Sequence, residues 1–208
     1  MVIFFYLCET RFMKYLICSD IHGSLTAFEK IVDYFNSFNC DKLLLLGDLL
    51  YHGPRNPLPQ GHNPKELAVK LNSLASKIIA CRGNCDAEVD QMVLNFPLMS
   101  DYFQIIDEGV TIFASHGHIY APLLNNGKLP KACESASKKI LVNKPALILY
   151  GHSHIQLLEK NAEDILICNP GSISLPKEDS PAGFAIYENS LVTLYDMNGQ
   201  KIKTQSVN

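Results

Sequence analysis

The sequence has no long run of lysine and arginine and no apolar segment of membrane-spanning length. Lysine and arginine together number 18, against 21 aspartates and glutamates, which gives a formal net charge of -3. Proteins that grip duplex nucleic acid or an acidic membrane concentrate positive charge, because they must neutralise phosphates. The composition therefore argues against a nucleic-acid polymer or a membrane as partner. It leaves small anionic substrates, which need only local charge.

A disulfide framework is also lacking, since the chain has seven cysteines, an odd number. A chain of 208 residues can bury a sizeable core without such a framework. We therefore expect free thiols and a cytoplasmic protein. Cys18, Cys81 and Cys168 lie in apolar strand candidates, where a free cysteine behaves as a small core residue.

The first residues lack the features of a targeting segment. MVIFFYLC is apolar, but no basic region precedes it, no small-residue cleavage site follows it, and it is too short to span a bilayer. Met13 opens the stretch MKYLICSD, which has the form of a natural start leading into a strand. No interdomain linker follows. We predict a single domain over residues 13–208 and assign no function to the extension at residues 1–12.

Strand candidates alternate with helical patterns in the first half of the chain, which predicts an α/β arrangement with parallel sheet. The strand candidates are KYLICSD, KLLLLGD and KIIACRGN. The helical candidates are residues 24–38, with apolar side chains at helical spacing behind a Ser24 cap, and residues 64–75. Between the second strand and the second helix lies the long loop YHGPRNPLPQGHNP, and loops of this length are usually functional.

The second half of the chain is richer in strand candidates. A hairpin is predicted to turn at Asp107-Glu108-Gly109, and residues 131–142 are predicted to be helical. The remaining strand candidates are ALILY, IQLLEK, ILICN, GFAIYE, LVTLYD and KIKTQS. A core of two sheets, one of them covered by helices, accounts for the patterns in both halves of the chain.

Polar residues and glycines follow five of the apolar strand candidates. The segments that follow them are Ser19–Gly23, Gly47-Asp48, Arg82–Asp86, Ser115–His118 and Gly151–His154. Ligand sites of open α/β sheets lie outside the carboxyl ends of the strands, so these segments are expected to converge. The glycines allow tight turns and close backbone approach.

The residue types in these segments are typical of a metal centre. Asp, His and Asn supply oxygen and nitrogen donors without a cluster of thiolates, which suits Mn, Fe, Ni or Zn. The donors are too many for one ion, and two ions that share a carboxylate can clamp a phosphoryl oxygen and generate hydroxide. Asp48 is the expected bridge. His152 and His154 are spaced so that extended backbone would direct each ring at a different ion.

Together these motifs resemble the calcineurin-like metallophosphoesterases. The motifs are DIHG (20–23), GD followed by HGPR (47–55), GNCD (83–86), SHGH (115–118), GHSH (151–154) and NPGS (169–172). SDIHGSL, YHGPRNPLPQG and RGNCDAEVDQM resemble in particular the small bacterial YfcE-type phosphodiesterases. The resemblance spans nearly the whole chain from Met13. It implies a four-layer α/β/β/α sandwich, with two mixed sheets flanked by helices.

Carried over by motif, the resemblance implies two sets of metal ligands. One ion would be held by Asp20, His22, Asp48 and His154, and the other by Asp48, Asn84, His116 and His152. Asp48 and Asn84 are also the expected catalytic residues. A hydroxide bridging the two ions would attack phosphorus in line. The expected ion is Mn, with Ni, Zn, Fe or Mg as alternatives, and the family commonly forms homo-oligomers.

Four further residues are expected to contact substrate or to orient the ligands, namely Cys85, His118, Arg55 and Asp86. Cys85 stands where many wider relatives carry a histidine that donates to phosphate or protonates the leaving group. Arg55 has two interpretations, a contact to substrate phosphate or a tie within the proline-rich loop. His118 is expected to orient a ligand, although direct ligation is the alternative. Residues 122–145, longer than in comparable proteins, would cap the site or form a subunit contact.

The function predicted from the sequence is metal-dependent hydrolysis of small phosphodiesters. A phosphomonoesterase is the alternative within the enzyme class. A non-catalytic metal-binding scaffold of the same fold is the alternative outside it. Every ligand position is filled in this sequence, which favours an enzyme over a scaffold.

Overall fold

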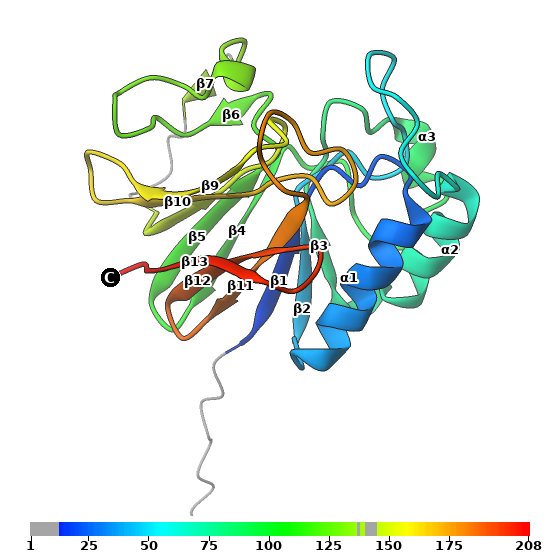
Figure 1. Ribbon diagram of the computed structural model, residues 1–208, viewed down its shortest axis with the longest axis horizontal. Helices are drawn as coiled ribbons and strands as arrows, with labels where there is room; N and C mark the ends of the chain where they lie inside the picture. Colours follow the sequence, from blue (N-terminus) through cyan, green and yellow to red (C-terminus); the bar gives the residue numbers. More distant parts are fainter. Residues whose placement is uncertain (1–12, 137, 140–144) are drawn as a thin grey trace, which may run out of the picture.

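The computed structural model describes residues 13–136, 138–139 and 145–208 (Figure 1). The predicted extension at residues 1–12 lies outside these ranges. The strands are β1 Tyr15–Cys18, β2 Lys42–Leu45, β3 Ile78–Ala80, β4 Tyr102–Asp107, β5 Val110–Ser115, β6 Tyr120–Ala121, β7 Lys138–Lys139, β8 Leu147–Leu149, β9 Gln156–Lys160, β10 Leu166–Pro170, β11 Gly183–Glu188, β12 Leu191–Asp196 and β13 Lys201–Ser206. The helices are α1 Leu25–Ser37, α2 Pro64–Ser73 and α3 Glu88–Gln91, with 3-10 turns η1 Ala75–Lys77 and η2 Lys131–Cys133.

Two mixed sheets form the body of the molecule. The six-stranded sheet has the order β13-β12-β11-β1-β2-β3, in which β1, β2 and β3 are parallel and the other neighbours antiparallel. The five-stranded sheet has the order β4-β5-β8-β10-β9, with β5, β8 and β10 parallel. The parallel strands form one end of the six-stranded sheet, where β3 is the edge strand, and the middle of the five-stranded sheet. Their carboxyl-terminal ends can share one edge of the molecule.

The helices α1, α2 and α3 lie on the outer side of the six-stranded sheet, as Figure 1 shows. Ser24 caps α1, because its hydroxyl accepts a hydrogen bond from the Ala27 N–H at 3.3 Å. The buried face of α1 consists of Phe28, Ile31, Val32 and Phe35, which is the face that its sequence spacing predicts. This face belongs to an apolar core shared with α2 and with the near side of β1 and β2.

A second apolar core fills the space between the two sheets. Successive side chains of a strand point to opposite faces, so Leu16 packs toward the helices while Ile17 packs toward the other sheet. Leu43 and Leu44 divide in the same way. Because both faces of β1 and β2 are covered, these strands are continuous apolar runs, as is typical of buried parallel strands.

The outer side of the five-stranded sheet is covered by the segment that contains β6, η2 and β7. Ala121 and Cys133 of this segment pack against Tyr150 and Ile167 of the sheet. The helix predicted for residues 131–142 is wrong in the part that the structure describes, where a single 3-10 turn is followed by irregular chain and the two residues of β7. Residues 137 and 140–144 lie outside the described ranges. The predicted fold class is confirmed, with this segment as the fourth layer.

No helix in the described part of the chain is both long enough and apolar enough to cross a membrane.

Candidate metal centre

The five segments predicted to converge do so, and backbone hydrogen bonds join them. The N–H groups of Asp20 and His22 donate to carbonyl oxygens of Gly47 and Asp48, at 3.1 and 2.9 Å. The N–H of Gly151 donates to the carbonyl of His116 at 2.9 Å, which joins the loops after β5 and β8. The positions of the polar side chains are therefore set by contacts between loops as well as by the strands that precede them.

The backbone at several predicted ligands adopts a left-handed conformation, also at His152 and His154, where the prediction of extended backbone is wrong. Asp20, His22, Asp48, His152 and His154 have φ values of 56°, 51°, 56°, 65° and 60°. They are five of the eleven non-glycine residues with positive φ in the described part of the chain. Such a conformation costs free energy for a residue with a side chain, and its concentration in one place is typical of functional sites.

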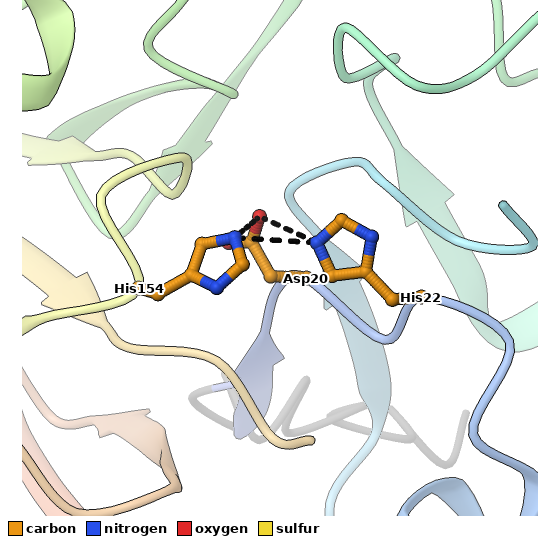
Figure 2. A group of neighbouring side chains, drawn as sticks. All are labelled: Asp20, His22 and His154. Atoms are coloured by element: carbon orange, nitrogen blue, oxygen red, sulfur yellow. Dashed lines mark hydrogen bonds and ion pairs between the residues drawn. The ribbon is translucent and has the colours of Figure 1, made fainter. Parts of the chain in front are cut away.

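Asp20, His22 and His154 form a group whose ligand atoms lie within 4.8 Å of one another. Figure 2 shows the two imidazole rings on either side of the Asp20 carboxylate. Oδ1 of Asp20 lies 3.6 Å from Nε2 of His22 and 3.2 Å from Nε2 of His154. The two Nε2 atoms are 3.2 Å apart. All three side chains are buried.

Asp20, Asp48 and His116 form a second group within the same limit. Oδ2 of Asp48 lies 3.5 Å from Nε2 of His116 and 3.7 Å from Nε2 of His22, so this carboxylate stands between the two groups. Its other oxygen, Oδ1, accepts the backbone N–H of Cys85 at 2.8 Å. With Oδ1 engaged in this hydrogen bond, Oδ2 is available to the group that contains His22 and to the group that contains His116.

Asn84 and His152 complete the set on the side of His116. Oδ1 of Asn84 lies 3.1 Å from Nε2 of His116, and Nδ1 of His152 lies 3.3 Å from the same atom. The backbone N–H of His152 donates to Oδ2 of Asp20 at 3.1 Å. The structure thus brings together all seven residues that the sequence proposes as metal ligands.

Backbone carbonyls determine which nitrogen three of the histidines present to the site. Nδ1 of His22, His116 and His154 lies 2.9, 2.7 and 2.6 Å, respectively, from the carbonyl oxygens of Tyr51, Leu46 and Leu175. A carbonyl oxygen only accepts, so Nδ1 carries a proton and a neutral ring presents the lone pair of Nε2. Two lone pairs cannot hydrogen bond. The close approach of His22 to His154 therefore requires a cation, either a proton on one ring or a metal ion.

The pKa values of Asp20, Asp48 and His116 also indicate that the site needs positive charge among its carboxylates. Burial by itself would raise the pKa of Asp48, but the adjacent His116 lowers it to about 2. Burial would lower the pKa of His116, whereas the charges of Asp48 and Asp20 raise it to about 10. The pKa of Asp20 is held well below its usual range, because His154 and His116 more than offset its burial. Without metal, the carboxylates thus retain protons on the imidazoles.

These residues fit divalent metal ions. Two buried carboxylates and several imidazole nitrogens converge, and they are oxygen and nitrogen donors of the kind that Mn, Fe, Ni and Zn accept. Oδ1 of Asp20 is buried beside Nε2 of His154 and of His22, at 3.2 and 3.6 Å. When these rings are neutral their Nε2 atoms present lone pairs and give Oδ1 no hydrogen bond. A buried carboxylate oxygen without a donor is costly unless a cation satisfies it.

Asp86 lies beneath the site and contacts backbone. Its carboxylate accepts the N–H groups of Asp48, Leu49 and Gly83 at 2.8, 2.8 and 2.7 Å. It therefore ties the loop after β2 to the loop after β3. Burial and the charge of Asp48 raise the pKa of Asp86 to about 6, so the carboxylate is mostly ionised at pH 7. Of the two roles expected for Asp86, the geometry favours orientation of Asp48 over contact with substrate.

Cys85 and His118 both adjoin the predicted ligands. Cys85, His22 and Asp48 form a third group, whose ligand atoms lie within 4.8 Å of one another. Burial, together with Asp48, raises the pKa of its thiol, so it is protonated at neutral pH. The ring of His118 lies 5.3 Å from that of His116, centroid to centroid, and belongs to no ligand group found among the described residues. Nδ1 of His118 is buried without a hydrogen-bond partner among the described residues, and its ring packs against the rings of His116 and His152. The expected orienting role stays a prediction.

A cleft of about 420 Å³ adjoins the candidate metal centre. It is lined by Asp48, Gly53, Pro54, Arg55, Asn56, Asn84, Cys85, Ala132, His152, His154 and Lys177. Arg55 thus lies where a substrate contact requires it. Ala132 brings the segment predicted to cap the site to the edge of the same cleft. Lys177 was not predicted, because a single exposed lysine in a loop carries no spacing or periodic signal.

The fold and the donor set are typical of metal-dependent phosphate-ester hydrolases, and comparison with known families agrees. Residues 13–190 match the calcineurin-like phosphoesterase superfamily domain. The match covers most of the chain. The chain belongs to the calcineurin-like phosphoesterase superfamily.

Similarity to individual proteins extends over nearly the whole chain. The chain is 40% identical to phosphodiesterase YfcE of Escherichia coli (strain K12) over 193 residues, which are 93% of this chain and 97% of that protein. The solved structure of the Escherichia coli phosphoesterase Yfce superposes with a TM-score of 0.83 at 37% identity, covering 94% of this chain and 100% of that one. The chain is thus a homologue of a phosphodiesterase.

More distant proteins share less of the sequence. Phosphodiesterase MJ0936 of Methanocaldococcus jannaschii is 25% identical over 165 residues, which are 76% of this chain and 83% of that protein. The structure of Vps29 from Entamoeba histolytica, complexed with zinc, superposes with a TM-score of 0.58 at 16% identity, covering 94% of this chain and 100% of that one. At that identity the likeness concerns the fold alone.

Proposed function

We propose that the protein is a metal-dependent phosphodiesterase that hydrolyses small phosphodiesters at a centre of two divalent ions. The observation that carries the proposal is the convergence of two ligand groups on Asp20 and Asp48. Each group supplies at least one imidazole in addition to carboxylate, as two adjacent ions require. The identity to a phosphodiesterase over nearly the whole chain supports the choice of substrate class.

The proposed ligand sets share one carboxylate. One ion would be held by Asp20, His22, Asp48 and His154, and the other by Asp48, Asn84, His116 and His152. The position of Asp48 Oδ2, at similar distances from His22 and His116, supports its assignment as the bridge. Manganese is the proposed ion, with Ni, Zn, Fe and Mg as alternatives that the same oxygen and nitrogen donors would accept.

Two such ions would clamp a phosphoryl oxygen and supply a bridging hydroxide, the proposed nucleophile, at neutral pH. The chain contributes the orientation of the ligands. Backbone carbonyls fix His22, His116 and His154, and Asp86 fixes the backbone at Asp48. Asn84, exposed at the cleft, would ligate through Oδ1 and retain an amide N–H that can donate to a phosphoryl oxygen.

The proposed partner is a small phosphodiester, and no membrane or nucleic-acid polymer is part of the proposal. The cleft has the volume of a site for a small molecule. We also propose a cytoplasmic location, which suits a chain whose six described cysteines are free thiols. A homo-oligomer remains a prediction, which the mass of the purified protein measured by light scattering would test.

The experiment that tests the proposed function is hydrolysis of bis-p-nitrophenyl phosphate and p-nitrophenyl phosphate by metal-stripped protein, with Mn, Ni, Zn, Mg or no ion added back. We expect turnover that depends on metal and favours the diester. Asp48→Asn is expected to abolish it, and Asp33→Asn, which alters an exposed carboxylate of α1, is expected to leave it unchanged. Turnover by Asp48→Asn with full metal content would show that the bridging assignment is wrong.

The same assay distinguishes the alternatives. Preference for p-nitrophenyl phosphate would identify a phosphomonoesterase. If folded protein binds two ions and hydrolyses neither ester with any metal, the function is that of a metal-binding scaffold.

A further inference from the structure

Two cationic side chains line the cleft, and the proposed chemistry does not use them. Arg55 lies in the loop after β2, and Lys177 lies in the loop between β10 and β11. Both are exposed, and neither forms an ion pair with any described residue. Their charges are therefore available to a ligand in the cleft.

Hydrogen bonds to His154 fix the backbone that carries Lys177. Nδ1–H of His154 donates to the carbonyl of Leu175 at 2.6 Å, and the N–H of Lys177 donates to the carbonyl of His154 at 3.2 Å. The segment from Leu175 to Lys177 thus follows the position of a predicted metal ligand.

Arg55 has an equivalent relation to His22. Nδ1–H of His22 donates to the carbonyl of Tyr51 at 2.9 Å, and the turn from Gly53 to Asn56 is closed by a hydrogen bond of 3.4 Å from the Asn56 N–H to the Gly53 carbonyl. Both cations are therefore on loops that are attached to the group Asp20, His22 and His154. The loop after β2 also accepts the Nδ1–H of His116, but it does so through the carbonyl of Leu46 at its beginning, nine positions before Arg55.

The charge of the reacting group does not require these two cations. A phosphodiester carries a single negative charge at its phosphorus centre, and the proposed divalent ions already neutralise it. Glu178 and Asp179 follow Lys177 in the sequence, but they do not line the cleft. Two cations that line the cleft, neither in an ion pair with a described residue, are thus complementary to a further anionic group on the substrate.

We propose that Arg55 and Lys177 form a subsite for a second anionic group, so that the preferred substrates are small phosphodiesters with a phosphorylated or carboxylated arm. The inference rests on the proposed function and deepens it. The arm would extend from the reacting phosphate toward the side of His22 and His154. Charge-assisted hydrogen bonds to this arm would favour such substrates by about 10- to 100-fold per cation.

The test uses three diesters that all release p-nitrophenol and differ in the charge of the other arm. Thymidine 5′-(p-nitrophenyl phosphate) has a neutral arm, its 3′-phosphorylated form has an anionic arm, and p-nitrophenyl phosphorylcholine has a cationic arm. For the metal-loaded wild-type protein, we expect kcat/KM to be highest for the anionic arm and lowest for the cationic arm. Lys177→Met and Arg55→Met should each lower the ratio of anionic-arm to neutral-arm kcat/KM by about 10- to 100-fold.

Two further variants serve as controls. Lys177→Arg keeps the charge and should retain most of the preference for the anionic arm, whereas Lys201→Met, at an exposed position of β13, should leave it unchanged. The arms are compared within one variant, so any general loss of metal or folded protein cancels from the ratio.

A ratio that stays the same in Lys177→Met and Arg55→Met would overturn the subsite, and so would a wild-type protein that does not discriminate between the arms. The proposed function would stand in either case, since turnover would remain. Absence of turnover on all three diesters by metal-loaded wild-type protein would overturn the proposed function and the subsite together.

Discussion

Asp86 shows how one buried carboxylate can support a site that it does not enter. It accepts three backbone N–H groups, from Asp48, Leu49 and Gly83. A carboxylate has enough lone pairs for three donors, whereas the amide of asparagine offers one acceptor oxygen and adds two donors. The geometry of Asp48 therefore depends on the chemical type of residue 86 as well as on its size.

Asp86→Asn is expected to destabilise the fold and weaken metal binding. Each N–H group left without an acceptor costs about 1 to 3 kcal/mol of unfolding free energy. Denaturant unfolding and metal titration would measure the two effects, with Asp33→Asn, on the exposed face of α1, as the matched control. Unchanged stability together with unchanged metal affinity would contradict the role assigned to Asp86.

Metal binding at His116 is coupled to loss of a proton from its ring. Its pKa in the folded, metal-free protein is about 10, above the value of 6.5 for an unperturbed histidine, because the attraction of Asp48 and Asp20 exceeds the effect of burial. Its protonation therefore stabilises the metal-free fold fully below pH 6.5, and this stabilisation is lost as the pH rises through 10. A metal ion must displace this proton to reach Nε2.

We accordingly expect metal binding at pH 7.5 to release about one proton from His116. Calorimetric titration in buffers of different ionisation enthalpy would measure the number released. The observed heat should change linearly with the ionisation enthalpy of the buffer. Equal heats in all buffers would show that the ring is already neutral before metal arrives.

The convergence of the seven proposed metal ligands could be predicted from sequence because each lies in a segment that follows an apolar strand and contains a glycine. Lys177 could not, since its position depends on hydrogen bonds between its loop and His154, which lies 23 positions earlier in the chain. The orienting role of Asp86 was likewise open, because the sequence does not show which backbone groups a carboxylate will face.

At the scale of the elements, the loop that follows β10 connects two members of the group Asp20, His22 and His154. The hydroxyl of Ser172 donates to the carbonyl of Asp20 at 2.7 Å and accepts the N–H of Leu175 at 2.8 Å. The carbonyl oxygen of Leu175 in turn accepts a hydrogen bond from the Nδ1–H of His154. One buried hydroxyl thus connects the loop that carries Asp20 with the residue that orients His154.

Ser172→Ala is expected to lower the unfolding free energy by about 1 to 3 kcal/mol, because it leaves buried polar groups without partners. It should also weaken metal binding, since the ring of His154 loses part of its support. Thermal unfolding and metal titration would measure these losses. Ser73→Ala, which removes an exposed hydroxyl that bonds within α2, is the matched control and should have little effect. An effect of Ser172→Ala no larger than that of the control would refute the connection.

The elements with a strong periodic pattern or a continuous apolar run were predicted correctly, whereas the helix at residues 131–142 was wrong in its described part. The helix α1 and the hairpin of β4 and β5 match their predicted positions closely. In the described part of the helix predicted at residues 131–142, Cys133 is the only buried residue among 131–136, so this part has no extended apolar face. Short helices depend on packing of such a face, and a single 3-10 turn suffices to bury Cys133.

At the scale of the whole molecule, the two cores share strands. Leu43 packs toward the helices and Leu44 toward the five-stranded sheet. Because β2 contributes to both cores, unfolding of β2 would disrupt both. The alternation of strands and helices predicts two covered sheets. It does not predict how irregular segments cover the outer side of the second sheet, since that packing follows no simple period.

Because the cores are joined, residues 13–208 are expected to unfold in one transition. Leu44→Ala should lower the unfolding free energy by about 2 to 5 kcal/mol, the usual cost of a cavity in a close-packed core. Within the wild-type protein, far-ultraviolet circular dichroism and release of bound metal should report the same unfolding midpoint, and the two probes should also agree within Leu44→Ala. Two separated transitions would contradict the prediction of a single domain.

The central claim is that two ions are bound side by side and share Asp48. It is tested most directly by anomalous diffraction from crystals of the protein grown with manganese. The account predicts two anomalous peaks about 3.5 to 4 Å apart, one beside His22 and His154 and the other beside Asn84 and His116. A single peak at full manganese occupancy, or peaks remote from Asp48, would contradict it.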